Sequence, residues 1–121
     1  MNLDQVFARA KSEKRAALIG YMPAGFPSKE GSTRLIAAMI EGGVDIVEVG
    51  FPYSDPVMDG PVIQQAAEIA LRNNTSAADV FDVVKTSSVP TLVMSYWNPI
   101  ERYGVDRFAK EIANVSGVGV I

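Results

Sequence analysis

Four short apolar runs, separated by amphipathic segments, constrain the fold of this chain more than any other feature of its sequence. The runs cover residues 16–22, 44–50, 90–96 and 117–121 and contain few charged side chains. Runs of this length and composition are typical of strands that are buried on both faces. Buried strands that alternate with amphipathic helices predict an α/β fold with a parallel sheet.

The segments between these runs carry helix start and stop signals. Asn2 and Ser28 are placed to cap the first two helices, and Gly42-Gly43 can end the second. Pro61 suits the first turn of a helix that extends to about residue 72, and Ser76 opens a capping-box pattern before the next helix. Another helical pattern starts at residue 105, and Asn98 and Pro99 before it are compatible with ordinary loop residues.

Composition excludes several classes of function. The net charge is -3 without a basic cluster, which argues against nucleic-acid binding. Neither cysteine nor histidine is present, which excludes disulfides, Ser-His-Asp catalysis and the commonest metal ligands. No apolar run approaches the roughly 18 residues of a membrane span, and no signal peptide is evident. We therefore expect a soluble cytoplasmic protein without a metal, in which carboxylates, Tyr or Lys do any acid–base chemistry.

Glu48 is the first candidate for such chemistry. In the run Val44–Gly50 it shares one face with Val44 and Ile46, near the carboxyl end of an otherwise apolar strand. Carboxylates are rarely buried without a partner, and active sites of α/β folds assemble at that end of the sheet. The alternative is a structural Glu paired with Lys or Arg. Asp45, at the start of the strand, is interpreted as structural.

The loop at residues 51–61 adds two more carboxylates over the same end of the sheet. Asp59 precedes Gly60-Pro61, where an acidic residue would also favour the start of a helix. Asp55 precedes Pro56 and is compatible with an ordinary turn residue. From position alone, neither carboxylate can be assigned a catalytic role.

Three further residues lie at the ends of the first and third strands. Tyr21, Met94 and Tyr96 could line a pocket above Glu48, although residues of these types more often belong to the core. The glycines form no nucleotide-binding pattern after a strand.

Residues 45–64, which read DIVEVGFPYSDPVMDGPVIQ, resemble the signature stretch of tryptophan synthase alpha subunits. The similarity continues in Gly25-Phe26-Pro27 and in Tyr96-Trp97-Asn98, and it covers essentially the whole chain. It implies a (β/α)8 TIM barrel, which typically needs about 250 residues. Residues 1–121 would then form the N-terminal part of a single TIM-barrel domain, roughly its first half, truncated within strand 4.

The resemblance also implies an activity, the retro-aldol cleavage of indole-3-glycerol phosphate to indole and glyceraldehyde 3-phosphate. Glu48 matches the general acid–base residue of the family. Asp59 matches the carboxylate that bonds the indole N–H and stabilises positive charge on the ring. Tyr21, Met94 and Tyr96 would line the indole pocket. No cofactor is implied in this subunit, and the phosphate-binding loops of the family would lie beyond residue 121.

A partner is implied as well: the beta subunit of tryptophan synthase, a pyridoxal-phosphate enzyme that forms an alpha2-beta2 heterotetramer with the alpha subunit. Pro52, Asp55 and Asn98 match positions on the face that meets this partner, although Pro52 and Asn98 could equally be ordinary loop residues. Phe26, Trp97 and Pro99 depart from the residues common in the family. A non-catalytic fragment or binding subunit that keeps only the partner-facing loops remains an alternative. The stretch at residues 45–64 argues against a third interpretation, another barrel enzyme of indole or histidine biosynthesis.

Overall fold

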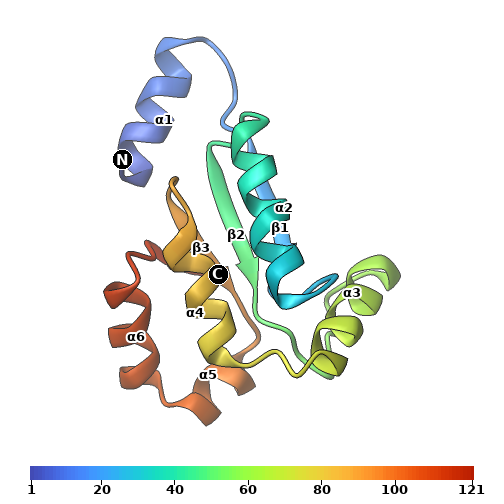
Figure 1. Cartoon of the computed structure of the whole chain (residues 1–121). Helices are drawn as coiled ribbons and strands as arrows, with labels where there is room; N and C mark the ends of the chain where they lie inside the picture. Colours follow the sequence, from blue (N-terminus) through green and yellow to red (C-terminus); the bar gives the residue numbers. More distant parts are fainter.

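A computed structural model describes all residues from 1 to 121 as one sheet with helices packed against it (Figure 1). The strands are β1 (Ile19–Pro23), β2 (Ile46–Gly50), β3 (Thr91–Met94) and β4 (Gly119–Val120). The helices are α1 (Leu3–Ser12), α2 (Lys29–Glu41), α3 (Pro61–Arg72), α4 (Ala77–Thr86), α5 (Trp97–Tyr103) and α6 (Val105–Asn114). None of these helices combines the length and apolar character that a membrane span needs.

The four strands are parallel and lie in the order β1-β2-β3-β4, which confirms the predicted α/β class. Their register aligns Tyr21 of β1 with Glu48 of β2, and Glu48 with Leu92 of β3. Two residues further along, on the same face of the sheet, Gly50 is aligned with Met94. The predicted site residues of the first three strands therefore occupy adjacent positions near the carboxyl end of the sheet.

The main hydrophobic core lies between the sheet and the helices that cover one of its faces (Figure 1). Val47 and Val49 of β2 and Val93 of β3 belong to a cluster of 11 buried residues. The helices α2, α4 and α6 supply most of the remaining members. Because side chains alternate along a strand, Glu48 lies on the opposite face of the sheet, away from these helices.

The strands are shorter than the apolar runs that predicted them. Residues 16–18 lie outside β1 because β2 starts only at Ile46, which is aligned with Ile19. The oxygen of Leu18 accepts hydrogen bonds from the N–H groups of Asp45 and Ile46, at 2.8 and 3.2 Å, so pairing begins at this point. A strand needs a paired neighbour, and the apolar run alone does not reveal where that neighbour begins.

The predicted caps are confirmed. Asn2 accepts a hydrogen bond from the N–H of Gln5 at 2.9 Å, and Ser28 accepts one from Gly31 at 2.9 Å. The N–H of Ser76 donates to Asp79 at 2.7 Å, as the capping-box pattern predicts. Helix α3 has the predicted bounds, with Pro61 in its first turn.

The interpretation of Asn98 and Pro99 as ordinary loop residues is wrong. Residues Trp97–Tyr103 form helix α5, although Asn98 and Pro99 favour turns in isolation. Pro99 falls within the first turn, where backbone N–H groups have no intrahelical partner and the missing proline donor is tolerated. Gly104 then joins α5 to α6 with a φ of 105°, a conformation that glycine adopts without strain.

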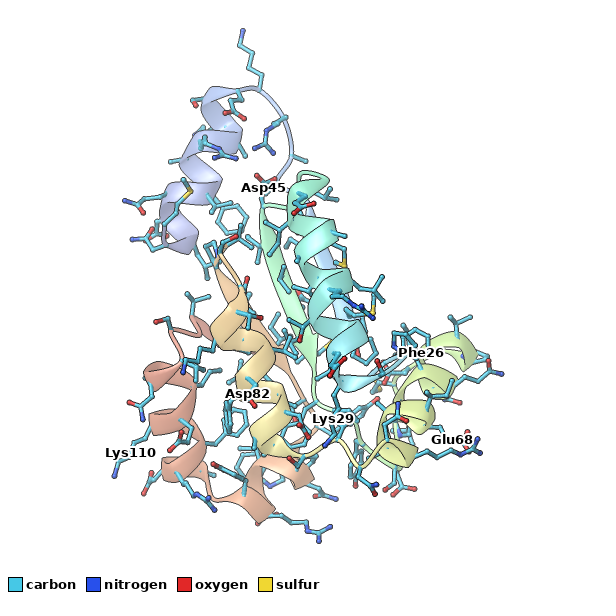
Figure 2. The ribbon with its side chains drawn as sticks, viewed as in Figure 1. Phe26, Lys29, Asp45, Glu68, Asp82 and Lys110 are labelled. Atoms are coloured by element: carbon cyan, nitrogen blue, oxygen red, sulfur yellow. The ribbon has the colours of Figure 1, made fainter.

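The loop after β1 is attached to the end of α3. Asn73 donates hydrogen bonds from Nδ2 to the oxygens of Gly25 and Pro27, at 3.0 and 2.9 Å. Phe26, in this loop, lies beside α3 (Figure 2) and lines a mainly apolar cavity of about 340 Å³ with Tyr21 and Ile69.

Candidate active site

Glu48 lies near the end of β2, on the sheet face that the helices leave open. Its side chain is half-buried, whereas Val47 and Val49 on the other face are fully buried. It forms no ion pair and no side-chain hydrogen bond within the chain, so the structural alternative of a Lys or Arg partner is not realised here. A carboxylate in this position is available for proton transfer to a bound molecule.

Asp59 lies in the loop between β2 and α3, at the same end of the sheet. Its N–H donates to the oxygen of Pro56 at 3.0 Å. From the first turns of α3, Gln64 Nε2 donates to the oxygen of Asp59 at 2.8 Å and to that of Pro56 at 3.4 Å. The N-cap of α3 is Gly60, which lacks a capping side chain, and Asp59 does not take over the capping role.

The carboxylate of Asp59 faces Tyr96, which follows β3. The Tyr96 hydroxyl donates to Asp59 Oδ2 at 3.2 Å and accepts a hydrogen bond from the N–H of Met58 at 3.0 Å. The ring of Tyr53 lies against the Tyr96 ring with centroids 5.3 Å apart. Tyr53 in turn accepts a hydrogen bond from Asn98 Nδ2 at 2.7 Å. Residues far apart in the sequence therefore hold this loop together.

Tyr21 occupies the position beside Glu48 and leans along β1 over Gly50. A Cβ atom at Gly50 would collide with the Tyr21 hydroxyl and ring, so this close approach requires glycine. Burial raises the pKa of Tyr21 to about 12, and electrostatic interactions with Asp59, Tyr96 and Glu48 contribute to this rise. The hydroxyl of Tyr21 therefore stays protonated at neutral pH.

Four of the five predicted catalytic and pocket residues line one cavity. Tyr21, Asp59, Met94 and Tyr96 border a space of about 10 Å³, enough for one water molecule. Glu48 does not border that cavity, although it is aligned with Tyr21 on the same sheet face. The cavity itself combines aromatic and apolar walls with the carboxylate of Asp59. A carboxylate beside such walls suits an apolar ring that carries or develops positive charge.

The predicted partner-facing residues differ in their exposure. Asp55 and Asn98 are exposed, whereas Pro52 is buried within the chain. Trp97 is 60% exposed at the start of α5, next to Asn98. Asp55 accepts a hydrogen bond from the neighbouring Ser54 at 3.1 Å and has no ion-pair partner in the chain.

Asp45 lies at the other end of β2, beside the segment that joins α1 to β1 (Figure 2). Its carboxylate accepts hydrogen bonds from two nitrogens of Arg15 at 2.7 and 2.8 Å, and from the N–H of Leu18 at 2.9 Å. Arg9 adds a third ion-pair contact at 3.1 Å. The hydrogen bonds from Arg15, followed by that from Leu18, hold the pKa of Asp45 well below its usual range. This is the structural role that the sequence predicted.

Sequence reasoning missed two residues that organise the site. Tyr53 supports Tyr96 through its ring, and Gln64 holds the backbone on both sides of Met58. Gln64 lies in the first turns of α3, close to the preceding loop. This position in the sequence could have indicated that its side chain binds the loop backbone. The contact between Tyr53 and Tyr96 has no local signal, because it joins two different loops.

Comparison with known proteins identifies the family. Residues 7–121 match the family described as "Tryptophan synthase alpha chain". The tryptophan synthase alpha chain of Thermobifida fusca is 57% identical over 98% of this chain, and that of Nocardia farcinica is 56% identical over 98%. The matches cover 45% and 46% of those two relatives, so this chain spans slightly less than half of their length.

Solved structures agree with this match. Tryptophan synthase from M. tuberculosis superposes with a TM-score of 0.95 at 46% identity, over 98% of this chain and 49% of that one. Tryptophan synthase subunit alpha from Legionella pneumophila gives a TM-score of 0.93 at 35% identity, over 99% and 48%. The fold is thus that of about half of the TIM barrel of these relatives, as the sequence predicted. By sequence and structure, this chain belongs to the tryptophan synthase alpha chain family.

Proposed function

We propose that residues 1–121 supply the catalytic carboxylates of a tryptophan synthase alpha chain, which cleaves indole-3-glycerol phosphate to indole and glyceraldehyde 3-phosphate. The observation that carries the proposal is the placement of Glu48 and Asp59 at one end of the sheet, with Tyr21, Met94 and Tyr96 beside them. In this proposal the residues form the N-terminal part of a single barrel domain.

Glu48 is the general acid–base residue of the proposed reaction. A proton is added to C3 of the indole ring, which makes the ring an electron sink. The hydroxyl on the adjacent side-chain carbon loses a proton as the C–C bond breaks, so that carbon becomes the aldehyde of glyceraldehyde 3-phosphate. The electron pair of the broken bond returns to the ring and gives indole. Proton gain and loss cancel, and Glu48 can serve both transfers because it has no partner within the chain.

Asp59 stabilises the protonated ring. A carboxylate that accepts a hydrogen bond from the indole N–H offsets the positive charge that develops on the ring during protonation. Tyr21, Met94 and Tyr96 supply flat and apolar surface for the ring. The substrate's phosphate would be held by loops of the second half of the barrel, in line with the family resemblance.

The same family resemblance supports a partner for this subunit. We propose that Asp55 and Asn98, which are both exposed, contact the beta subunit of tryptophan synthase in an alpha2-beta2 assembly. Pyridoxal phosphate belongs to that partner, and the proposed chemistry of Glu48 and Asp59 requires no cofactor in this subunit.

The test uses a chain of the relatives' full length. Residues 1–121 are joined to the C-terminal half of the Thermobifida fusca alpha chain, and this protein is called the completed chain below. Purified completed chain, alone and with the beta subunit, is given indole-3-glycerol phosphate, and indole release is measured. We expect indole formation that depends on both Glu48 and Asp59. A folded completed chain that releases no indole would refute the proposal and favour a non-catalytic binding subunit.

A further inference from the structure

The hydroxyl of Tyr96 contacts the loop before α3 at two consecutive residues. It accepts a hydrogen bond from the N–H of Met58 at 3.0 Å and donates one to Asp59 Oδ2 at 3.2 Å. A single oxygen atom therefore fixes both the backbone next to Asp59 and the orientation of its carboxylate. This is more than the pocket-lining role that the family resemblance implies for Tyr96.

The loop has little else to hold that carboxylate. Val57 and Met58 are 80% and 84% exposed, so the residues before Asp59 are not packed into the core. Gln64 binds the carbonyl oxygens of Pro56 and Asp59, which fixes the backbone but leaves the Asp59 side chain free to rotate. The Tyr96 hydroxyl is the only group of this chain that donates a hydrogen bond to the carboxylate.

Tyr96 is itself firmly placed. It directly follows β3 and Ser95, and it forms the N-cap residue of α5, so two regular elements define its backbone. Its ring packs on Tyr53, with centroids 5.3 Å apart and an angle of 32° between the planes. The Tyr53 hydroxyl accepts a hydrogen bond from Asn98 at 2.7 Å, which fixes the second ring. A donor supported in this way can orient a flexible acceptor.

We propose that Tyr96 is a positioning residue, whose hydroxyl holds Oδ2 of Asp59 so that Oδ1 is directed at the substrate's indole N–H. This inference rests on the proposed function. One carboxylate oxygen is occupied by the protein, and the other remains as the acceptor for the ring. A fixed acceptor avoids reorientation during the reaction, when positive charge develops on the ring.

The first experiment removes only the hydroxyl. Tyr96→Phe keeps the ring and its packing on Tyr53, so a role limited to lining the pocket predicts near-normal kinetics. We expect kcat of the completed chain to fall about 10-fold or more with a small change in KM, since a hydrogen bond to a charged group is lost. Tyr103→Phe is the matched control, because the Tyr103 hydroxyl forms no hydrogen bond and lies outside the proposed site. Unchanged kcat in Tyr96→Phe would overturn the inference.

The second experiment asks whether Tyr96 acts through Asp59. Indole formation is measured in single turnovers at high enzyme concentration for Tyr96→Phe, Asp59→Asn and the double variant. If Tyr96 positions the charge of Asp59, the hydroxyl has nothing to position once that charge is gone. Tyr96→Phe should then cost less than about 2-fold in the Asp59→Asn background, a non-additive result. Losses that multiply would mean that Tyr96 acts independently and would overturn the inference.

The outcomes separate this inference from the function on which it rests. Near-normal turnover by Asp59→Asn would refute the assigned role of Asp59. A severe loss in Asp59→Asn combined with normal turnover in Tyr96→Phe would refute only the positioning role. Thermal unfolding of each variant accompanies the kinetics, and a kcat loss with an unchanged Tm supports positioning over a general effect on folding.

Discussion

Arg15 and Asp45 form a bidentate ion pair at the amino-terminal end of the sheet, with nitrogen–oxygen distances of 2.7 and 2.8 Å. Asp45 is only 5% exposed, and it also accepts the N–H of Leu18 at 2.9 Å. The pair connects the segment after α1 to the start of β2, at the end of the sheet opposite to the candidate active site. Asp45 therefore has a structural role, because hydrogen bonds from Arg15 and Leu18 already occupy its carboxylate oxygens.

Asp45→Asn should therefore destabilise the completed chain, because an amide cannot pair with both nitrogens of Arg15 and leaves the guanidinium without its anion. We expect the Tm to fall by several degrees at neutral pH, as measured by circular dichroism. Asp82→Asn is the control, since Asp82 is exposed on α4, forms no ion pair and lies far from Asp45 (Figure 2). Equal Tm values for the two variants would contradict the role of Asp45.

The stabilisation from Asp45 should depend on pH. Its pKa is lowered in the folded chain, first by the hydrogen bonds from Arg15 and then by that from Leu18. The contribution is fully present above the unfolded carboxyl pKa of about 3.9 and is lost as the pH falls from there through the folded pKa. The Tm difference between the unmodified chain and Asp45→Asn should thus shrink as the pH is lowered below about 4. A difference that stays constant in acid would contradict the assignment.

Glu48→Gln should nearly abolish indole formation by the completed chain without unfolding it. Glutamine has a similar shape but cannot accept or donate a proton in the reaction, and loss of such a group costs about 10²–10⁴ in rate. Because Glu48 has no partner in the chain, the Tm should change little. Indole release and thermal unfolding are measured together, with the exposed Glu68→Gln on α3 as the control. Near-normal turnover would mean that Glu48 is not the acid–base residue.

Asp59→Asn should lower kcat severely, by about 10² or more, because an amide cannot supply the negative charge that stabilises the protonated ring. The neutral side chain keeps one oxygen that can accept the indole N–H, so substrate affinity should change less than kcat. Steady-state kinetics of the completed chain separate the two effects. A rise in KM with an unchanged kcat would indicate that Asp59 contributes only to binding.

Gly50→Ala should displace Tyr21, because the added methyl group would collide with the Tyr21 hydroxyl and ring. Tyr21 is proposed to line the indole pocket, so we expect KM to rise about 10-fold or more as the wall of the pocket shifts. Gly119→Ala in β4 is the matched control, since its Cβ would make only an ordinary contact with Leu92 at 3.4 Å. The absence of any kinetic difference between the two variants would show that Tyr21 does not shape the pocket.

The 121-residue chain by itself should have no useful lyase activity and should self-associate. Around β4, Val118, Val120 and Ile121 are 38%, 44% and 55% exposed, and a mainly apolar cavity of about 500 Å³ lies beside the last two. Exposed apolar surface of this kind, next to an unpaired strand edge, favours association. Sedimentation velocity and an indole assay check both points, with the completed chain as the control. A monodisperse monomer with measurable turnover would contradict the prediction.

The predictions that succeeded from sequence rest on local rules. The alternation of apolar runs with amphipathic segments was enough to predict parallel strands, and the caps at Asn2, Ser28 and Ser76 follow from short-range hydrogen bonds. The prediction failed at α5, where Asn98 and Pro99 favour turns by themselves but are tolerated in a helix that packs beside α6. Local preferences are weak there, and tertiary packing overrides them.

The sequence by itself determined which face of β2 carries Glu48, because alternation along a strand is a property of the backbone and needs no knowledge of neighbouring elements. It also carried the family motif that points to Asp59. Only the tertiary structure decided that the Asp59 carboxylate meets the hydroxyl of Tyr96, 37 residues away, instead of capping α3. The contact forms because β3 ends close to the loop that carries Asp59, and the packing of the whole sheet sets where β3 ends.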